Sequence, residues 1–266
     1  MNDKGRRTRV VVTRPAGEAA RWVNELEALG FDALALPLID IVPPLDPAPL
    51  VSARSRMSRY EAVMFVSPNA VYGFLGQGAF EELASAALVA GTRAWSPGPG
   101  TTRALQLMGW PSDAIDEPAP DAPQFDSESL WVQIEKQVQH GNRALIVRGA
   151  NAEGQPAGRD WLAKQLRAGG VVVDEVAAYR RVCPELDAAE RGLAVAAASD
   201  ASVWLFSSSE AISNLRELLP AQDWSAAHAV ATHERIARAA LLAGFGRVAQ
   251  SRPTLESVAA SIESVS

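Results

Sequence analysis

The sequence has a single cysteine, Cys183, and only three histidines among its 266 residues. One cysteine cannot form an internal disulfide, and its isolation points to a reducing compartment. The histidines, His140, His228 and His233, do not have the spacing of metal ligands. We therefore expect no structural metal, and we place His140 and His228 at the surface or at helix ends.

Long apolar runs are also absent. No uninterrupted apolar stretch approaches about 20 residues, the length needed to span a membrane as a helix. The apolar run that follows the charged N-terminal residues 1–7 is too short for the core of a signal peptide. We therefore expect a cytoplasmic protein that does not contact a membrane.

Three common enzyme signatures are missing. Residues 149–154 have the glycine spacing of a phosphate-binding loop, but Gln155 and Pro156 follow where that loop needs Lys and Ser or Thr. Residues 94–98 resemble a nucleophile elbow, yet the first glycine is absent and Pro97 has no N–H for an oxyanion. No glycine fingerprint of a dinucleotide-binding fold occurs. An enzyme with this sequence should work without a cofactor.

The charge balance argues against a nucleic-acid partner. The net charge is −6 and the isoelectric point is 5.2, whereas phosphate binding requires a basic face. Arginine nevertheless outnumbers lysine by 22 to 3. Codon bias explains this excess; alternatively, some arginines bind a ligand rich in carboxylates through their planar fork of donors.

The composition is that of a globular protein long enough for two domains, with 48% hydrophobic and 21% charged residues. The Pro- and Asp-rich segment 117–126 is predicted to be a surface loop. Elsewhere short apolar strands alternate with amphipathic helices, a pattern that predicts parallel sheets with helices on both faces.

Six landmarks of residues 1 to about 140 return in the same order in residues 141–266. The matched segments are 10–14 with 144–148, 22–30 with 161–169, 36–43 with 177–184, 65–71 with 206–212, 103–109 with 238–244, and 128–130 with 256–258. Any two runs of strand–helix units share a binary pattern, but the common order favours an internal duplication. We expect Gly30 and Gly169 to be left-handed helix caps, and Trp22 and Trp161 to pack equivalently against the sheets.

The segments after the strands are the expected functional positions, because ligands of parallel sheets bind beyond the carboxyl ends of strands. These segments are 13–15, 67–69, 96–101, 148–149, 207–209 and 232–235. Most precede a helix, so free backbone N–H groups should converge on an anion at one sheet edge. Ordinary helix capping by Ser, Thr and Asn accounts for each segment taken singly.

Taken together, seven motifs resemble those of uroporphyrinogen-III synthase, and the resemblance covers nearly the whole chain. They are Val-Val-Thr-Arg-Pro at 11–15, Leu-Pro-Leu at 36–38 before Pro43, Phe-Val-Ser-Pro-Asn-Ala-Val at 65–71, Gly-Pro-Gly-Thr at 98–101, Arg-Gly at 148–149, Tyr-Arg at 179–180 and Phe-Ser-Ser at 206–208. Two segments depart from the pattern. The loop 150–158 looks long, and His-Glu-Arg-Ile at 233–236 stands where a second Gly-Pro-Gly-Thr would fall.

The resemblance implies two similar α/β domains joined by a two-stranded ladder, with a cleft between them. Domain 1 would combine residues 1–38 with 184–266, and domain 2 would comprise residues 43–178. The chain would cross between the domains at 38–43 and 178–184.

The resemblance also implies a reaction. The linear tetrapyrrole hydroxymethylbilane would lose water and close to uroporphyrinogen III with inversion of ring D. We expect a lyase that acts on this small molecule as a monomer, without metal or other cofactor and without a nucleic-acid partner.

One side chain, Tyr179, is the candidate for chemistry, as a general acid for the departing hydroxyl. Its repeat partner is Leu38, so only the second half has a hydroxyl there; alternatively, Tyr179 packs and hydrogen-bonds locally. The expected substrate-binding residues are Arg14, Ser67, Asn69, Gly98, Thr101, Arg148, Gly149, Ser207, Ser208, Thr232, His233 and Arg235. Arg180 and Arg181 are weaker candidates, and any of these arginines is equally explained by an ordinary ion pair.

Two other classes of protein fit parts of the sequence. A non-catalytic two-domain protein that closes on an anionic ligand would bind the bilane without turnover. A regulator built from paired receiver-like domains would need acidic clusters at its strand ends, where this sequence has Arg and Ser.

Overall fold

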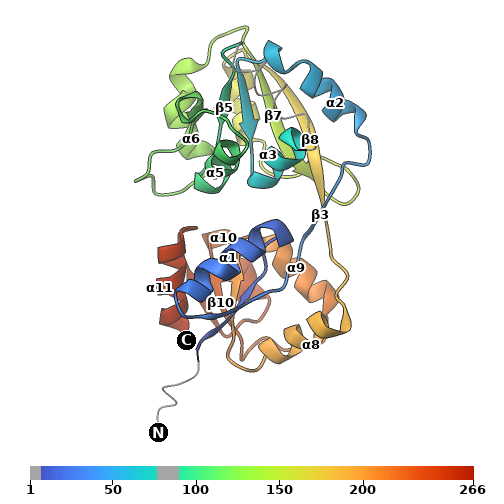
Figure 1. Ribbon diagram of the computed structural model, residues 1–266, viewed down its shortest axis with the longest axis vertical. Coiled ribbons are helices and arrows are strands. Elements are labelled where there is room, and N and C mark those ends of the chain that lie inside the picture. The colour runs from blue at the N-terminus through green and yellow to red at the C-terminus, as the bar shows by residue number, and fades with distance from the viewer. Residues whose placement is uncertain (1–6, 77–89) are drawn as a thin grey trace. The chain divides into compact units, whose positions relative to one another are not determined.

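The computed structural model describes residues 7–76 and 90–266, and the chain divides into two compact units. Unit 1 consists of Met1–Asp40 and Val182–Ser266, and unit 2 of Ile41–Arg181. The chain passes from one unit to the other within β3 (Asp40–Val42) and β8 (Val172–Val182), which are neighbouring strands in one sheet (Figure 1). The domain limits expected from the sequence stay predictions, and the N-terminal residues 1–6 lie outside the described part.

Unit 1 contains a five-stranded sheet in the order β11-β10-β9-β1-β2, and all neighbours run parallel. Its strands are β1 (Arg9–Val12), β2 (Asp32–Ala35), β9 (Val203–Phe206), β10 (His228–Ala231) and β11 (Arg247–Gln250). Its helices are α1 (Ala16–Ala28), α8 (Ala188–Ala197), α9 (Ser209–Leu218), α10 (Glu234–Leu242) and α11 (Leu255–Val265).

The central strands of unit 1 are buried on both faces, which explains their continuous apolar sequence. Alternate residues such as Val10 and Leu205 pack with helices α1 and α11 on one face. Trp204 points to the other face, where it meets Trp224 at 5.3 Å between ring centroids and donates from Nε1 to the Ala197 carbonyl at the end of α8.

Unit 2 contains a six-stranded sheet in the order β3-β8-β7-β4-β5-β6, parallel from β8 to β6. Its other strands are β4 (Ala62–Phe65), β5 (Arg93–Trp95), β6 (Ile115–Asp116) and β7 (Arg143–Ala150). Its α-helices are α2 (Ala48–Ser55), α3 (Pro68–Leu75), α5 (Pro99–Leu107), α6 (Ser127–Ile134) and α7 (Trp161–Ala168), and its short 3-10 helices are η1 (Met57–Arg59), η2 (Ser112–Ala114) and η3 (Glu135–Gln137).

The sheet of unit 2 has an apolar layer on each face. Phe65 and Val147 belong to the layer under α2, α3 and α5, where Phe65 meets Phe74 edge to face. Met64 and Ile146 belong to the opposite layer, under α6 and α7. Helices therefore cover both faces, and the carboxyl ends of the strands are the positions left for polar residues.

The two sheets have matching strand orders. Reading from β2, unit 1 has β2-β1-β9-β10-β11, and reading from β8, unit 2 has β8-β7-β4-β5-β6. In unit 1, the first two strands of the first repeat, β1 and β2, lie beside the last three strands of the second repeat, β9 to β11. In unit 2, the first two strands of the second repeat, β7 and β8, lie beside three later strands of the first repeat, β4 to β6. The expected α/β fold with parallel sheets is confirmed, and the matching orders are consistent with a duplication.

One repeat alignment is wrong by a single residue. Gly30 has the expected left-handed φ of 92°, but in unit 2 the left-handed glycine is Gly170, with φ 78°, and not Gly169. Trp22 is correspondingly buried in the core, whereas Trp161 begins α7 and packs against Trp131. The core position that corresponds to Trp22 belongs to Leu162, because the glycine that closes α7 lies one residue later than the alignment placed it.

The surface position expected for His228 is also wrong. His228 begins β10, is half-buried, and its Nδ1 has no hydrogen-bond partner in the described part of the chain. Burial lowers the pKa of His228, and the nearby Arg247 lowers it further, while a hydrogen bond to the backbone of Val265 opposes both effects.

This histidine predicts a loss of stability in mild acid. A pKa lowered in the folded state means that the unfolded chain takes up the proton first, so the free energy of unfolding decreases as the pH falls below about 6.5. The urea midpoint should fall more between pH 7.5 and pH 5.5 for the wild type than for His228→Gln. Equal decreases in the two proteins would show that His228 does not control this dependence.

Candidate functional site

The predicted binding segments lie at the carboxyl ends of strands, but they divide between two sheets. Segments 13–15, 207–209 and 232–235 follow β1, β9 and β10 in unit 1. Segments 67–69 and 96–101 follow β4 and β5 in unit 2, and 148–149 lies within β7. The expectation of a single sheet edge is therefore wrong. Three of the segments belong to the sheet of unit 1, and the other three belong to the sheet of unit 2.

Three predicted residues of unit 2 meet at one point. Tyr179, on β8, is 5% exposed, and its Oη lies 3.0 Å from Oγ of Ser67. The ring lies against Gly149 of β7: a Cβ added there would stand 2.6 Å from Tyr179 Cζ and 2.9 Å from Oη. Only glycine at position 149 leaves room for this ring, so β7 and α3 together fix where the phenol hydroxyl lies.

The geometry around Ser67 is that of a helix start. Ser67 precedes α3 in an extended conformation, and its Oγ accepts a hydrogen bond from the Ala70 N–H at 3.2 Å. The start of α5 is nearby, since a Cβ on Gly100 would lie 3.7 Å from Pro68 Cγ. Two adjacent helix starts direct backbone N–H groups to the same region, an arrangement that favours an anion.

Polar side chains hold the loop before α5, and two of them, Thr102 and Glu117, were not among the residues predicted from the sequence. Ser96 Oγ donates to the Gly98 carbonyl at 2.9 Å, and Thr102 Oγ1 lies 2.6 Å from Oε2 of Glu117. Gly98 is buried, and a Cβ on it would lie 2.8 Å from Phe125 Cβ. Glu117 and Phe125 belong to the Pro- and Asp-rich segment, which therefore packs on the loop that precedes α5.

The side chains of Asn69 and Thr101 sit in the first turns of these two helices. Asn69 is half-buried on α3, and Thr101 is buried on α5. Thr101 donates its backbone N–H to the Gly98 carbonyl at 3.0 Å. Both predicted residues therefore lie in unit 2 with Ser67, Gly98 and Tyr179.

Arg148 is inside β7 and already has partners. It is 6% exposed; Nη1 donates to Glu175 at 2.9 Å, and Nη2 donates to the Arg159 carbonyl at 2.6 Å. The β7–β8 register shifts immediately after it, between Arg148 and Gly149. This guanidinium therefore ties β8 and the loop before α7 to the sheet.

Arg14 and Arg180 are held in similar ways. Arg14 donates to Glu18 at 2.9 Å and stacks 4.5 Å from the centroid of the Trp22 ring. Burial lowers the pKa of Arg14, while Glu18 opposes that effect. Arg180 donates to the carbonyls of Pro43 and Ala152 at 3.1 and 2.7 Å.

The predicted residues of unit 1 are helix caps and their neighbours. Ser208 Oγ accepts from the Glu210 N–H at the start of α9, and His233 Nδ1 accepts from the Arg235 N–H at the start of α10. Ser207 and Thr232 are half-buried beside them, and Arg235 is exposed. His233 thus caps α10 where Gly98 caps α5 in the other unit, which accounts for the departure of residues 233–236 from the Gly-Pro-Gly-Thr motif.

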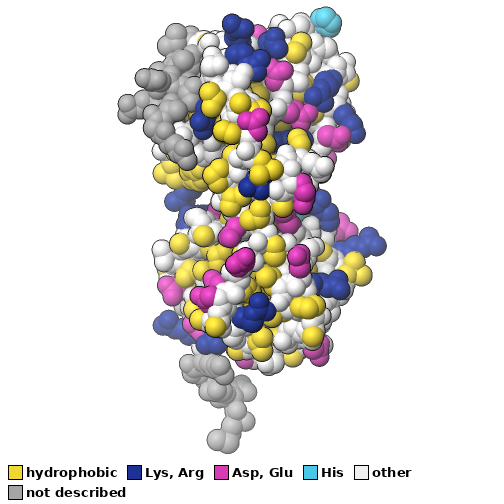
Figure 2. Space-filling model, turned by 90° about the vertical axis from the view of Figure 1, so that its right-hand side faces the viewer, with side chains coloured by type: hydrophobic (Ala, Val, Ile, Leu, Met, Phe, Trp, Pro, Cys, Tyr) yellow, Lys and Arg dark blue, Asp and Glu magenta, His cyan; other side chains and the backbone are white. Residues whose placement is uncertain are grey.

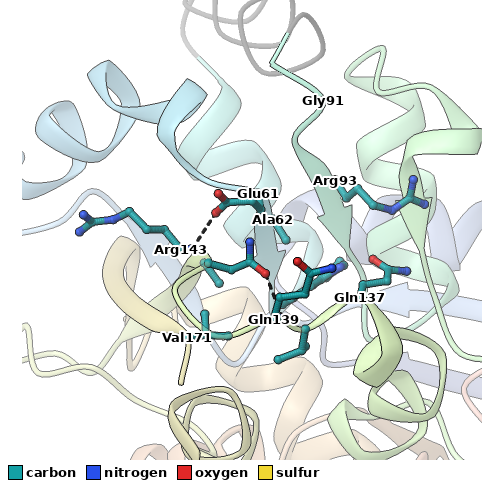
Figure 3. A pocket seen from close by; sticks show the side chains of 12 residues that line it. Glu61, Ala62, Gly91, Arg93, Gln137, Gln139, Arg143 and Val171 are labelled. Carbon is teal, nitrogen blue, oxygen red and sulfur yellow. Dashed lines mark hydrogen bonds between the residues drawn. The ribbon is translucent and has the colours of Figure 1, made fainter. Parts of the chain in front are cut away.

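A separate cavity of about 250 Å³ lies at the amino ends of the strands in unit 2 (Figure 3). Its wall includes Glu61, Arg93 and Arg143, at the starts of β4, β5 and β7. In Figure 3 the Arg93 and Arg143 guanidinium groups point outward to either side, and Arg93 is held by Asp116 at 2.6 Å. This cavity is at the opposite edge of the sheet from Ser67 and Tyr179.

Residues 7–76 and 90–266 contain no cluster of three or more His, Cys, Asp or Glu arranged to hold a metal ion. Over the same residues, no helix is both long and apolar enough to cross a membrane.

Comparison with known proteins gives consistent relatives. The uroporphyrinogen-III synthase of Synechococcus elongatus is 27% identical over 228 residues, which cover 82% of this chain and 78% of that protein. The uroporphyrinogen-III synthase of Chlorobaculum parvum is 28% identical over 187 residues, or 68% of this chain and 67% of that protein.

Solved structures share the fold at lower identity. The crystal structure of uroporphyrinogen-III synthetase from Helicobacter pylori matches 97% of this chain and 100% of its own, with 14% identity and a TM-score of 0.59. A mutant uroporphyrinogen III synthase from Thermus thermophilus matches 97% of this chain and 98% of its own, with 15% identity and a TM-score of 0.52.

The family is established by a match over most of the sequence. The family model described as Uroporphyrinogen-III synthase HemD matches residues 20–260. The chain therefore belongs to the uroporphyrinogen-III synthase family, whose members are enzymes of porphyrin biosynthesis.

Proposed function

We propose that this protein converts hydroxymethylbilane to uroporphyrinogen III, as a cofactor-free carbon–oxygen lyase, with Tyr179 as the general acid. The observation that carries the proposal is the cluster of Ser67, Gly149 and Tyr179, which lies where β4 and β7 end beside β8. This cluster puts a buried phenol next to two helix starts, where an anionic substrate is favoured.

The proposed chemistry needs one proton at the start. The carbon–oxygen bond to the terminal hydroxyl breaks, its electron pair leaves with the oxygen, and the Tyr179 proton completes a water molecule. The azafulvene left behind is attacked by the substituted carbon of ring D, and fragmentation and reclosure of the spiro intermediate invert that ring. The pyrrole proton released at closure restores the phenol, so the net product besides the macrocycle is water.

The larger task is selectivity. Hydroxymethylbilane closes readily without an enzyme, but to the isomer in which ring D is not inverted. The protein must hold the chain so that the substituted carbon of ring D is the nearer nucleophile. A hundredfold preference requires only about 2.7 kcal/mol between the two closures.

We assign substrate binding chiefly to backbone and small polar groups. The substrate carries an acetate and a propionate on each of four pyrroles, all ionised near neutral pH. The protein has a net charge of −6, so local donors must outweigh the overall field. The starts of α3 and α5, with Asn69, Gly98 and Thr101, supply donors in unit 2, and Ser207, Ser208, Thr232, His233 and Arg235 supply them in unit 1.

Arg14 and Arg148 are given a smaller part in substrate binding than the backbone N–H groups. Each already donates to a carboxylate, Glu18 or Glu175, at 2.9 Å. The partner carboxylate largely balances the charge of such an arginine, which reaches the substrate directly only by giving up that partner. Arg180 and Arg181 remain weaker candidates for substrate binding.

We also propose that the protein is a cytoplasmic monomer that binds a small molecule and no nucleic acid; its net charge of −6 disfavours a nucleic-acid partner. Figure 2 shows basic and acidic side chains interspersed over the visible face of each unit, with no continuous basic stripe on that face. A nucleic-acid partner would require such a stripe.

The phenol hydroxyl of Tyr179 is tested by removing it. Tyr179→Phe should lower kcat by about ten- to a hundredfold, because the leaving hydroxyl then lacks its proton donor. The rate of isomer III formation, corrected for spontaneous closure, measures this loss. Tyr72→Phe, on the exposed face of α3, is the matched control and should keep wild-type kcat. Wild-type turnover in Tyr179→Phe would dispose of the acid role.

The room for the Tyr179 ring depends on the glycine at position 149. Gly149→Ala should lower kcat by about tenfold or more, because the new Cβ displaces the Tyr179 ring from its position. The overpacking should also cost about 1–3 kcal/mol of stability. Gly192→Ala in α8, where an added Cβ meets nothing within 4 Å, is the control and should fold and turn over normally.

A double variant separates the two roles of Gly149. If the glycine acts through Tyr179, Gly149→Ala should cost little further activity in a Tyr179→Phe background. Losses that multiply fully in the double variant would mean that Gly149 acts independently of the tyrosine.

A further inference from the structure

Ser67 makes two hydrogen bonds whose combination has a chemical consequence. Its Oγ lies 3.2 Å from the Ala70 nitrogen and 3.0 Å from Tyr179 Oη. The Ala70 N–H is fixed by the helix and can only donate, so Ser67 Oγ is the acceptor in that bond. A hydroxyl has one proton to give, and at Ser67 that proton remains available for Tyr179.

In the second bond either hydroxyl can be the donor. A hydroxyl that accepts from a backbone N–H becomes a better donor, since linked hydrogen bonds polarise one another. This polarisation favours Ser67 Oγ as the donor to Tyr179 Oη, an arrangement that directs the phenol proton away from Ser67. The eight-residue helix α3 adds its positive end behind Ser67.

We infer that Ser67 is a positioning residue for the reaction: it holds the Tyr179 oxygen and stabilises the phenolate that remains after the phenol has given up its proton. This inference rests on the proposed acid role of Tyr179. The proton goes from Tyr179 Oη to the departing hydroxyl, the carbon–oxygen electron pair leaves in water, and Ser67 keeps its own proton throughout while donating it to the phenolate.

The other unit provides an internal contrast. Ser208, the repeat partner of Ser67, also caps a helix, by accepting from the Glu210 N–H. The repeat partner of Tyr179 in unit 1 is Leu38, which has no oxygen to receive a hydrogen bond. A serine at the start of this helix thus serves as a cap in both units, and it faces a tyrosine only in unit 2.

Three variants separate the donor from the cap. Ser67→Ala removes both, Ser67→Asp keeps a capping oxygen but has no proton to donate, and Ser67→Thr keeps both. We expect kcat to fall about tenfold in the Ala and Asp variants, with KM nearly unchanged, and to return to near the wild-type value in Ser67→Thr. Asp187→Ala, which removes the cap of α8 in unit 1, is the control for loss of a cap and should leave kcat unchanged.

A spectroscopic measurement tests the hydrogen bond without turnover. The chain has three tyrosines, so carbon-13 labelling at tyrosine Cζ gives three NMR signals, which Tyr→Phe variants assign. The Tyr179 signal should change from phenol to phenolate at higher pH in Ser67→Ala and Ser67→Asp than in the wild type and Ser67→Thr.

Each result bears on the inference. Full kcat in Ser67→Asp, an effect on KM alone, or an unmoved Tyr179 transition in Ser67→Ala would overturn it. A moved transition together with full turnover in Tyr179→Phe would show that the hydrogen bond exists but that the proposed acid role fails, and the inference would fall with it. An unmoved transition with an inactive Tyr179→Phe would leave the acid role standing and reject the part given to Ser67.

Discussion

The parallel pairing of β4, β7 and β8 is the constraint on which the rest of the proposed site depends. Parallel strands end at a common edge of the sheet, so residues that follow one strand meet residues far away in the sequence. Ser67 and Tyr179 are 112 positions apart, yet their hydroxyls approach to 3.0 Å across the intervening β7. A slip of the β7–β8 pairing by one residue would turn the Tyr179 ring to the opposite face of the sheet.

The sequence was informative where a role depends on a local pattern. Ser67, Gly149 and Ser208 were identified because each ends or follows an apolar strand, and Tyr179 because its repeat partner lacks a hydroxyl. It was uninformative where a role depends on distant partners. No sequence spacing marks the pairing of Arg148 with Glu175 or the contact of Glu117 with Thr102. The core position equivalent to Trp22 could be assigned to Leu162, and not to Trp161, only from the conformation of the glycine that closes α7.

The electrostatics of the site are local. A chain with net charge −6 is proposed to hold a substrate with eight carboxylates, and Arg14 and Arg148 are already paired with Glu18 and Glu175. Backbone N–H groups at helix starts have no counter-charge to give up, so they bind an anion without breaking an ion pair. We therefore propose that small polar residues and backbone N–H groups at the strand ends bind the substrate more readily than the paired arginines beside them.

The most direct test of the account is the isomer made from hydroxymethylbilane. Freshly prepared bilane is incubated with the purified protein, the products are oxidised, and isomers I and III are separated by chromatography. The account predicts isomer III well above the amount formed without protein. Isomer I alone, from correctly folded protein, would contradict it and favour a non-catalytic two-domain protein that binds an anionic ligand.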